Sequence, residues 1–397
     1  MTVPYFHAGG LGAGTLTIAQ AGTIRAQGAV TVSNAVALNN NVTIGGTDPL
    51  TMTGTMTLSA ARTITNSNTT STTTFAAVNG ATYGLTFSGN GNTTVTGVIG
   101  TTTGGLTKNG TGTLTLTNAA STYTGVTSIA AGTLSASKLA NGSATSSIGT
   151  STNVAANLLI GPGATLQYTG TGDTTDRFFT LNGGTTSSST HTLDASGSGA
   201  INFNNVGSLA YGTAAKLRTL KLIGSNTGNN TLAATLANNT TAALSVVKDG
   251  AGKWILTGAS AYTGATNVNA GGSGDIELNW LGYSGGHVPI SGISGPPILL
   301  FPPPAAFSSF GFRPSSFIPH SGFRFRHFPP TPPLHFRRPP TVPALPARLS
   351  PPHRGGMPPT FSRRRYADGD IPARQGNIKR PGRHHARSNL ACDGRLW

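Results

Sequence analysis

The first two thirds of the chain alternates apolar and polar residues with a period of two. Leu50-Thr-Met-Thr53, Thr55-Met-Thr-Leu58 and Thr113-Leu-Thr-Leu-Thr117 show the alternation most clearly. A period of two places Leu and Met on one face of a strand and Thr on the other. The branched Cβ atoms of Thr and Val also suit a pleated surface. The pattern therefore predicts that residues 10–270 are all-β, with strands almost throughout.

Short polar steps separate these runs and mark turns. Gly and Asn-Gly pairs take the positive φ angles that tight turns need. Examples of Asn-Gly pairs are Asn79-Gly80, Asn109-Gly110, Asn141-Gly142 and Asn182-Gly183. Turns this frequent indicate that the strands between them are short and numerous.

Two long segments of the chain match each other although they lie far apart in the sequence. Residues 106–132 recur, one residue shorter, as residues 246–271. Stacked copies of such a unit form a solenoid, in which each coil pairs its backbone with the next. We therefore predict a parallel β-solenoid (β-helix) with roughly 20 residues per coil, and a β-sandwich stays open as the alternative. The matching positions are Lys108 with Lys248, Gly110 and Gly112 with Gly250 and Gly252, and Tyr123-Thr-Gly125 with Tyr262-Thr-Gly264.

The composition changes the expected interior. Charged residues make up only 9% of the chain, and 55 residues are Gly, whereas about 25% charged residues are typical. This composition predicts a core that is not packed mainly by Leu and Phe. We expect coils that need little apolar filling, with ladders of Thr and Asn satisfying polar groups.

Charge and proline divide the chain near Gly271-Gly272. Residues 1–271 hold 10 Lys/Arg, 5 Asp/Glu and three of the 25 prolines, and residues 272–397 hold the remaining 16 Lys/Arg, 5 Asp/Glu and 22 prolines. We predict a repeat domain over 1–271 and a disordered, basic, Pro/Arg-rich tail over 272–397. A sudden change to Pro, Arg, His and Ser is also what GC-rich DNA gives in the wrong reading frame. We therefore expect an out-of-frame C-terminus, with a genuine disordered tail as the alternative.

The repeated segments resemble the autotransporter-associated β-strand repeat of large secreted or surface bacterial proteins. Residues 106–134 carry the pattern Leu-Thr-Lys-x-Gly-x-Gly-Thr-Leu-x-Leu, then Tyr-Thr-Gly and a final Ala-Gly-Thr-Leu. The copy at 246–271 departs from it at Lys253-Trp254 and lacks the final Thr-Leu. The resemblance implies a β-helical passenger region displayed outside the cell, and it brings no catalytic residues. The region between the two copies also resembles the sequence that lies between such repeats in long members of the family. The segments that carry this likeness are Leu166-Gln-Tyr-Thr-Gly170, Thr175-Asp-Arg-Phe-Phe-Thr-Leu181 and Leu193-Asp-Ala-Ser-Gly197.

Few residues before position 272 have the chemistry of an active site. Asp173 and Asp176 could form the carboxylate pair of a glycoside hydrolase, but a turn-forming role, or pairing with Arg177, fits their loop better. His191 and Asp194 could belong to a catalytic triad with a serine. Three residues apart on a strand, however, they face opposite sides, and no G-x-S-x-G turn is present.

The segment Asp249-Gly-Ala-Gly-Lys253 superficially resembles a phosphate loop. Trp254 stands where a Ser or Thr would hold Mg²⁺, and the glycine spacing differs, so a turn between strands is the better interpretation. No Asp-x-Asp series marks a calcium site, and the lone Cys392 provides no thiolate cluster. We predict no catalytic residues, no metal site and no cofactor.

Two patterns of side chains remain as candidates for binding. Regular Thr-x-Thr arrays could present hydroxyl lattices of the kind that ice or carbohydrate requires, although any solvated strand face has outward Thr. Tyr123 and Tyr262 are equivalent, and we expect them to stack at corners of the coils. The Thr arrays are Thr51/Thr53, Thr55/Thr57 and Thr113/Thr115/Thr117.

These observations predict a non-catalytic scaffold for display or adhesion on a secreted or surface bacterial protein. The alternative is a carbohydrate-binding or carbohydrate-active β-helix. Extracellular glycans or proteins are the expected partners. The basic tail predicts at most non-specific contact with nucleic acid. The sequence shows no signal peptide and no membrane-spanning run, and we expect a truncated reading frame.

Overall fold

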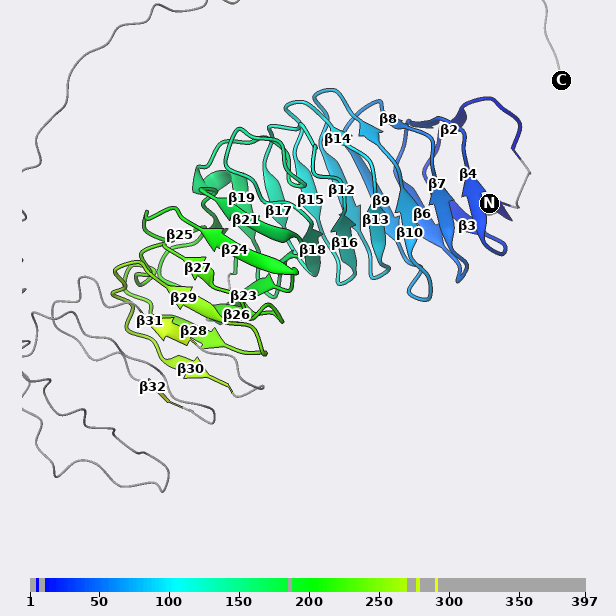
Figure 1. Cartoon of the computed structure of the whole chain (residues 1–397). Coiled ribbons are helices and arrows are strands. Elements are labelled where there is room, and N and C mark those ends of the chain that lie inside the picture. Colours follow the sequence, from blue (N-terminus) through cyan, green and yellow to red (C-terminus); the bar gives the residue numbers. More distant parts are fainter. Residues whose placement is uncertain (1–4, 7–10, 185–187, 270–275, 279–289, 292–397) are drawn as a thin grey trace, which may run out of the picture. The chain divides into compact units, whose positions relative to one another are not determined.

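The computed structural model describes residues 5–6, 11–184, 188–269, 276–278 and 290–291. These residues form 32 strands and one short 3₁₀ helix, η1 (Ala155–Asn157), with no α-helix among them. Every pairing between the described strands is parallel. Figure 1 shows the strands of successive coils lying side by side. The predicted all-β parallel solenoid is confirmed, and the sandwich alternative is wrong, because a sandwich is built from antiparallel strands.

Each coil passes through up to three sheets in a fixed order. The first of them, sheet 1, joins ten strands of the described residues. In sheet 1 each strand pairs with the strand one coil earlier, as β15 does with β12. The strands of sheet 1 are β1 (Tyr5–Phe6), β3 (Gly22–Ala26), β6 (Val42–Gly45), β9 (Arg62–Asn66), β12 (Leu85–Ser88), β15 (Leu106–Lys108), β17 (Thr127–Ile129), β19 (Leu158–Ile160), β22 (Thr180–Leu181) and β25 (Ala210–Tyr211).

Sheet 2 follows sheet 1 in each coil and joins twelve of the described strands. It is the one sheet that continues from the early coils to the end of the described residues. Its strands are β4 (Val30–Val32), β7 (Leu50–Met52), β10 (Thr73–Phe75), β13 (Thr93–Val95), β16 (Thr113–Leu116), β18 (Thr133–Ala136), β20 (Thr165–Tyr168), β23 (Ser188–Ala195), β26 (Leu217–Ile223), β28 (Leu244–Lys248), β30 (Thr266–Val268) and β32 (Ile290–Ser291).

The third side of the coil is built from two separate five-stranded sheets in the described residues. Sheet 3N closes the early coils and sheet 3C the later ones. Sheet 3N contains β2 (Leu16–Ile18), β5 (Val36–Leu38), β8 (Met56–Leu58), β11 (Val78–Asn79) and β14 (Ile99–Gly100). Sheet 3C contains β21 (Thr171–Thr175), β24 (Gly199–Phe203), β27 (Asn230–Leu232), β29 (Trp254–Leu256) and β31 (Ile276–Leu278).

Coil length separates two regions of the solenoid. In residues 16–136, the narrow coils, the pairing partners are close in sequence, as in Leu16–Val36 and Thr51–Thr74. Between β18 and β28, the wide coils, the partners along sheet 2 are further apart, as in Thr133–Thr165. The predicted coil of roughly 20 residues therefore holds for the narrow coils.

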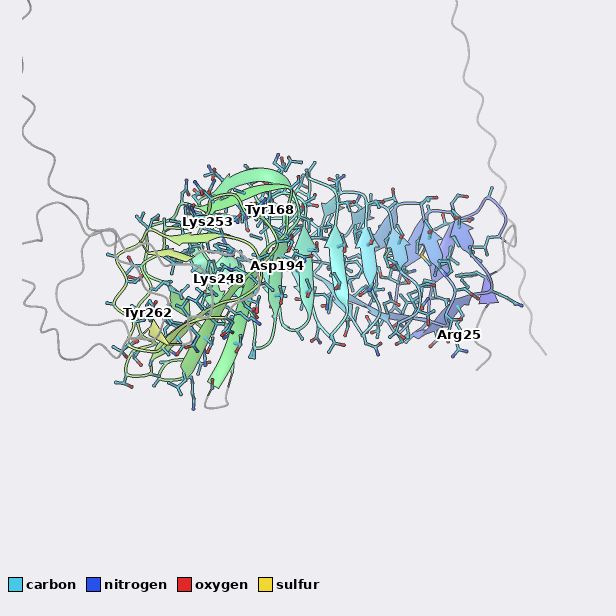
Figure 2. All side chains as sticks on the ribbon, turned by 60° about the horizontal axis from the view of Figure 1, so that its bottom comes forward. Arg25, Tyr168, Asp194, Lys248, Lys253 and Tyr262 are labelled. Carbon is cyan, nitrogen blue, oxygen red and sulfur yellow. The ribbon has the colours of Figure 1, made fainter. Side chains whose placement is uncertain are left out.

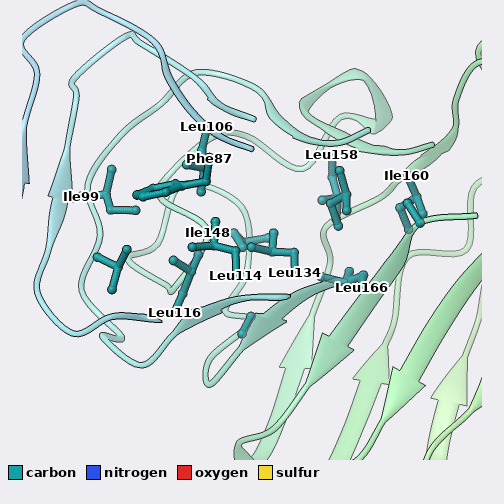
Figure 3. Packing of buried hydrophobic residues seen from close by; sticks show 14 of the residues in the cluster. Phe87, Ile99, Leu106, Leu114, Leu116, Leu134, Ile148, Leu158, Ile160 and Leu166 are labelled. Atoms are coloured by element: carbon teal, nitrogen blue, oxygen red, sulfur yellow. The ribbon is translucent and has the colours of Figure 1, made fainter. Parts of the chain in front are cut away.

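One continuous apolar column fills the interior of the coils. It extends from Phe6 to Tyr262, every sheet contributes to it, and its members are chiefly Leu, Ile, Val, Phe, Ala and Met. Figure 3 shows Phe87, Leu106 and Leu114 packed in this column. The expectation of a core with little apolar filling is therefore wrong. Each strand contributes only about two inward side chains, so a low overall apolar content still fills the whole interior.

The two matched segments occupy different sides of the coil. In the first, β15 lies in sheet 1, β16 in sheet 2 and β17 again in sheet 1. In the second, the equivalent strands β28, β29 and β30 lie in sheets 2, 3C and 2. In each copy, a loop without a described strand, residues 117–126 or 257–265, stands where the remaining side would be. The repeat therefore encodes two sides and a bridging loop, independently of which sides they are.

Two short strands lie beyond the boundary expected at Gly271. Ile276–Leu278 pairs with β29, and Ile290–Ser291 pairs with β30. The rest of the tail over 272–397 lies outside the described residues. Its disorder and its origin from another reading frame stay predictions.

Candidate functional site

The two candidate acids, Asp173 and Asp176, bind a loop of a neighbouring coil. This lateral loop, residues 137–154, lies between β18 and η1. Asp173 accepts a hydrogen bond from the backbone N–H of Leu139 at 3.0 Å. Asp176 accepts from the N–H of Gly142 at 2.7 Å and from the side chain of Asn153 at 3.0 Å. The carboxylates therefore hold backbone and amide donors of another coil. Asp173 lies in strand β21 and not in the expected loop, so the predicted turn-forming role is replaced by support of the lateral loop.

Arg177 anchors the same lateral loop from inside. Its side chain is buried, and burial lowers its pKa. The hydrogen bonds of the guanidinium go to loop oxygens and not to the neighbouring carboxylates, so the predicted Arg177–Asp pairing is replaced by a cage of carbonyl groups. The acceptors are the backbone oxygens of Ala140, Ala144, Gly149 and Ser151 and the hydroxyl of Ser151, at 2.8 to 3.2 Å.

His191 and Asp194 lie on opposite faces of β23, as their spacing predicts. His191 is fully buried, and its Nε2 lies 3.0 Å from the hydroxyl of Ser189. Its Nδ1 lies 2.8 Å from the carbonyl oxygen of Ile160, so Nδ1 carries the proton. Burial lowers the pKa of His191 to about 4. Asp194 instead accepts a hydrogen bond from Gln167 on the outer face, so the structure forms no Ser–His–Asp triad here.

The Asp249–Lys253 segment is the turn between β28 and β29. Lys248, the residue before it, donates to the backbone oxygens of Asp249 and Gly250 at 3.1 and 2.8 Å. In the first copy, Lys108 donates in the same way to Asn109 and Gly110 at 2.9 and 2.7 Å. The repeated lysine therefore caps the carbonyl groups of its own turn. Burial lowers the pKa of Lys108 to about 8.

The repeated tyrosines fill the side of the coil that lacks a strand. Tyr123 and Tyr262 are both buried. Each hydroxyl pairs with the Thr four residues later, Tyr123 with Thr127 at 2.9 Å and Tyr262 with Thr266 at 2.6 Å. Figure 2 labels Tyr262 and Lys248 of the second copy. Burial raises the pKa of Tyr123, and neither phenol is placed to meet a ligand.

Two further observations concern metals and membranes. In the described residues, no three His, Cys, Asp or Glu side chains come together as metal ligands would. The same residues include no helix with the length and apolar character that a membrane crossing requires.

The Thr arrays noted in the sequence separate in the structure. Thr51 and Thr115 lie on sheet 2, Thr57 lies on sheet 3N, and Thr53 lies in a turn. The lattice expected from the Thr-x-Thr arrays is therefore not formed by those residues together. Instead, single columns run from coil to coil, and the longest on sheet 2 is Thr31, Thr51, Thr74, Thr94 and Thr115.

A second column forms the floor of an open groove on the outer face of sheet 1. Its register joins Thr63 to Thr86, Thr86 to Thr107, and Thr107 to Ser128. All four side chains are half-buried and line the groove. They come from four successive coils, about 4.8 Å apart.

The turns that precede the sheet 1 strands form one wall of this groove. Gly84, Gly105 and Gly125 line it, together with the exposed Thr103 and Val126. These turns lengthen from residues 59–61 in one coil to residues 80–84 and 101–105 in the next two. The wall is therefore a consequence of turn length.

The ends of the groove differ in chemistry. At one end lie Asn41 and Arg62, and the guanidinium of Arg62 is held by the carbonyl of Leu38 at 3.2 Å and the hydroxyl of Ser59 at 2.9 Å. At the other end, the column continues from Ser128 to Leu159, where the hydroxyls stop. Sequence reasoning missed this groove, although the regular spacing of one coil between its Thr and Ser residues was a usable signal.

Comparison with known proteins supports the resemblance. Residues 106–136 and 246–272 match the family model described as the passenger-associated-transport-repeat. These are the two segments that run from β15 to β18 and from β28 to β30. The predicted kinship with autotransporter passenger repeats is confirmed for these segments.

The chain is also similar to the adhesin BmaC autotransporter of Brucella suis biovar 1 (strain 1330). The two are 48% identical over 138 residues, which is 35% of this chain and 4% of the adhesin. The chain therefore spans only a small part of that relative's length. No solved structure is significantly similar to the chain.

Proposed function

We propose that the described solenoid is a non-catalytic scaffold for display or adhesion within a secreted or surface-exposed bacterial passenger. The observation that carries the proposal is the pair of passenger repeats, built into one parallel stack of coils. Similarity to part of an autotransporter adhesin supports the same role. A stack of this kind extends with every added coil and presents side chains at fixed intervals.

The contacts of the candidate acids support the non-catalytic part of the proposal. Asp173 and Asp176 bind the lateral loop, and His191 is buried against Ser189 and Ile160. A general acid or base must reach a substrate proton directly or through one water molecule. Because these groups serve the coils themselves, their removal should change stability and not turnover.

Labelling of intact cells tests the surface location. Antibody raised against the lateral loop, residues 137–154, should label intact cells of the producing bacterium, and added protease should remove the signal. Beads coated with the full 397-residue chain should be retained on surfaces of extracellular matrix and glycans. Labelling that requires cell lysis would contradict the proposal.

Assays for turnover separate a scaffold from a carbohydrate-active enzyme. The full chain should release no product from a panel of polysaccharides. Hydrolysis that disappears in Asp173→Asn while the fold is kept would overturn the non-catalytic proposal.

A further inference from the structure

The hydroxyl groove on sheet 1 has the free donors and acceptors of a binding surface. Among the hydrogen bonds of the described residues, none involves the hydroxyls of Thr63, Thr86, Thr107 or Ser128. Thr hydroxyls elsewhere are used internally, as in Thr96, which donates to the carbonyl of Phe75 in the coil before it. The groove hydroxyls therefore face solvent with their hydrogen-bonding capacity intact.

The backbone of sheet 1 excludes one class of ligand. Strands β9, β12 and β15 each pair with a strand on both sides. Their N–H and C=O groups are consequently engaged, so a peptide cannot add to this face as a further strand. A ligand in the groove must be recognised through side chains, and the floor offers hydroxyls at a regular interval of about 4.8 Å.

Charge selects among polar ligands. Among the described residues, Arg62 is the one charged side chain that lines the groove, and no carboxylate lines it. Its guanidinium is already oriented by Leu38 and Ser59, which reduces the entropy lost when it binds a carboxylate. The groove thus combines a row of neutral hydroxyls with one positioned cation.

We propose that this groove binds a linear glycan that carries carboxylate groups. The inference rests on the proposed function, because it names the ligand class that an adhesive scaffold of this shape would take. The glycan lies along the solenoid axis, with successive sugar hydroxyls meeting Thr63, Thr86, Thr107 and Ser128. A uronate carboxylate lies against Arg62 at one end.

Matched pairs of threonines test the floor of the groove. Alginate oligosaccharides should bind the full-length chain, as measured by isothermal titration calorimetry. The double variant Thr86→Val/Thr107→Val keeps the side-chain shape and removes two hydroxyls, so binding should weaken about tenfold or more. The control Thr94→Val/Thr115→Val changes two half-buried threonines of the sheet 2 column and should weaken binding less than about twofold.

The role of Arg62 is tested with the same oligosaccharides after their carboxylates are esterified. The unmodified chain should prefer the charged form about tenfold, and Arg62→Gln should remove this preference. Circular dichroism verifies that each variant is folded.

Two results would overturn the proposal: alginate that fails to bind the unmodified chain, or equal weakening by both threonine pairs. A preference that Arg62→Gln leaves unchanged would overturn the assignment of the carboxylate site. Cell-surface labelling does not depend on these outcomes, so the glycan groove can fail while the scaffold proposal stands.

Discussion

The narrow and wide coils share one apolar column but stabilise their turns differently. Narrow coils turn within a few residues, and their buried residues are chiefly apolar, with small polar side chains such as Asn66 and Thr93 and a single buried charge among the described residues, Lys108. The wide coils add longer loops and bury Arg177, His191 and Arg218. The longer loops contain backbone carbonyl groups that do not pair with a neighbouring strand. Each such buried carbonyl group needs another hydrogen-bond donor. The comparison shows that extra length on one side of a coil is accommodated by buried polar side chains.

Arg177→Met should have the largest effect on this difference. The substitution keeps much of the side-chain volume and leaves buried acceptors of the lateral loop unsatisfied, at a cost of about 4 kcal/mol in local stability. Limited proteolysis and hydrogen exchange should show that residues 137–154 open while the narrow coils stay protected. Arg62→Met in a narrow coil is the control. The half-buried Arg62 donates to the carbonyl of Leu38 and the hydroxyl of Ser59, which water can reach, so its loss should cost less than about 1 kcal/mol.

Equal protection of the lateral loop in Arg177→Met and in the unmodified chain would show that the other contacts of the loop, among them those of Asp173, Thr175 and Asp176, are sufficient to hold it. The wide coils would then not depend on a buried cation.

Acid should weaken the wide coils through His191. Its pKa is lowered to about 4 by burial, with a smaller contribution from Arg218, whereas the unfolded chain binds the proton at a pH of about 6.5. Burial of neutral His191 therefore costs no stability above pH 6.5. As the pH falls toward 4, the unfolded chain takes up a proton that the folded chain does not, and the folded state loses stability. The free energy of unfolding should fall by up to about 3 kcal/mol over this range. Denaturant titrations from pH 7 to pH 4 measure it.

His191→Asn removes the titrating group, so the variant should lose less stability than the unmodified chain between these pH values. If both chains lose the same amount, the acid sensitivity belongs to other groups.

The two copies of the repeat provide the finest comparison, through their matched turn glycines. Gly110 and Gly250 both have φ near +70°, at 72° and 73°. A Cβ at Gly110 would lie 2.3 Å from the backbone oxygen of Gly89, but a Cβ at Gly250 would lie 3.1 Å from that of Gly224. Gly110→Ala should cost about 2 kcal/mol and Gly250→Ala about 1 kcal/mol. Thermal unfolding of the two variants tests the order, and equal costs would mean that the second copy is packed as tightly as the first.

Much of the fold could be predicted from local pattern. Period-two runs such as Thr113–Thr117 located the strands, and the Asn-Gly steps located the turns, because both depend on neighbouring residues. The apolar core was misjudged, because composition averages outward Thr with inward Leu. Per strand, the inward positions of β16, Leu114 and Leu116, are as apolar as those of any core.

Features that depend on coil length escaped the sequence. The separation of the two copies along the chain does not reveal that the second begins in sheet 2. The wide coils contain more residues than the narrow ones, so the number of residues between the copies does not tell on which side of a coil the second copy starts. The pairing of Thr86 with Thr107 requires the coil length to the exact residue, and the predicted length of roughly 20 residues does not fix this register. The acceptors of Arg177 lie 26 to 37 residues before it, a separation that no local pattern specifies.

The parallel pairing of each strand with the coil before it has a mechanical consequence. A pull on the two ends of the stack loads the hydrogen bonds between coils, and the outermost coil separates first, because its strands have neighbours on one side only. Releasing one coil of about 20 residues frees about 70 Å of chain for the loss of about 5 Å of stack height. A tether of this design would lengthen in steps under load, and the coils still stacked would keep their shape.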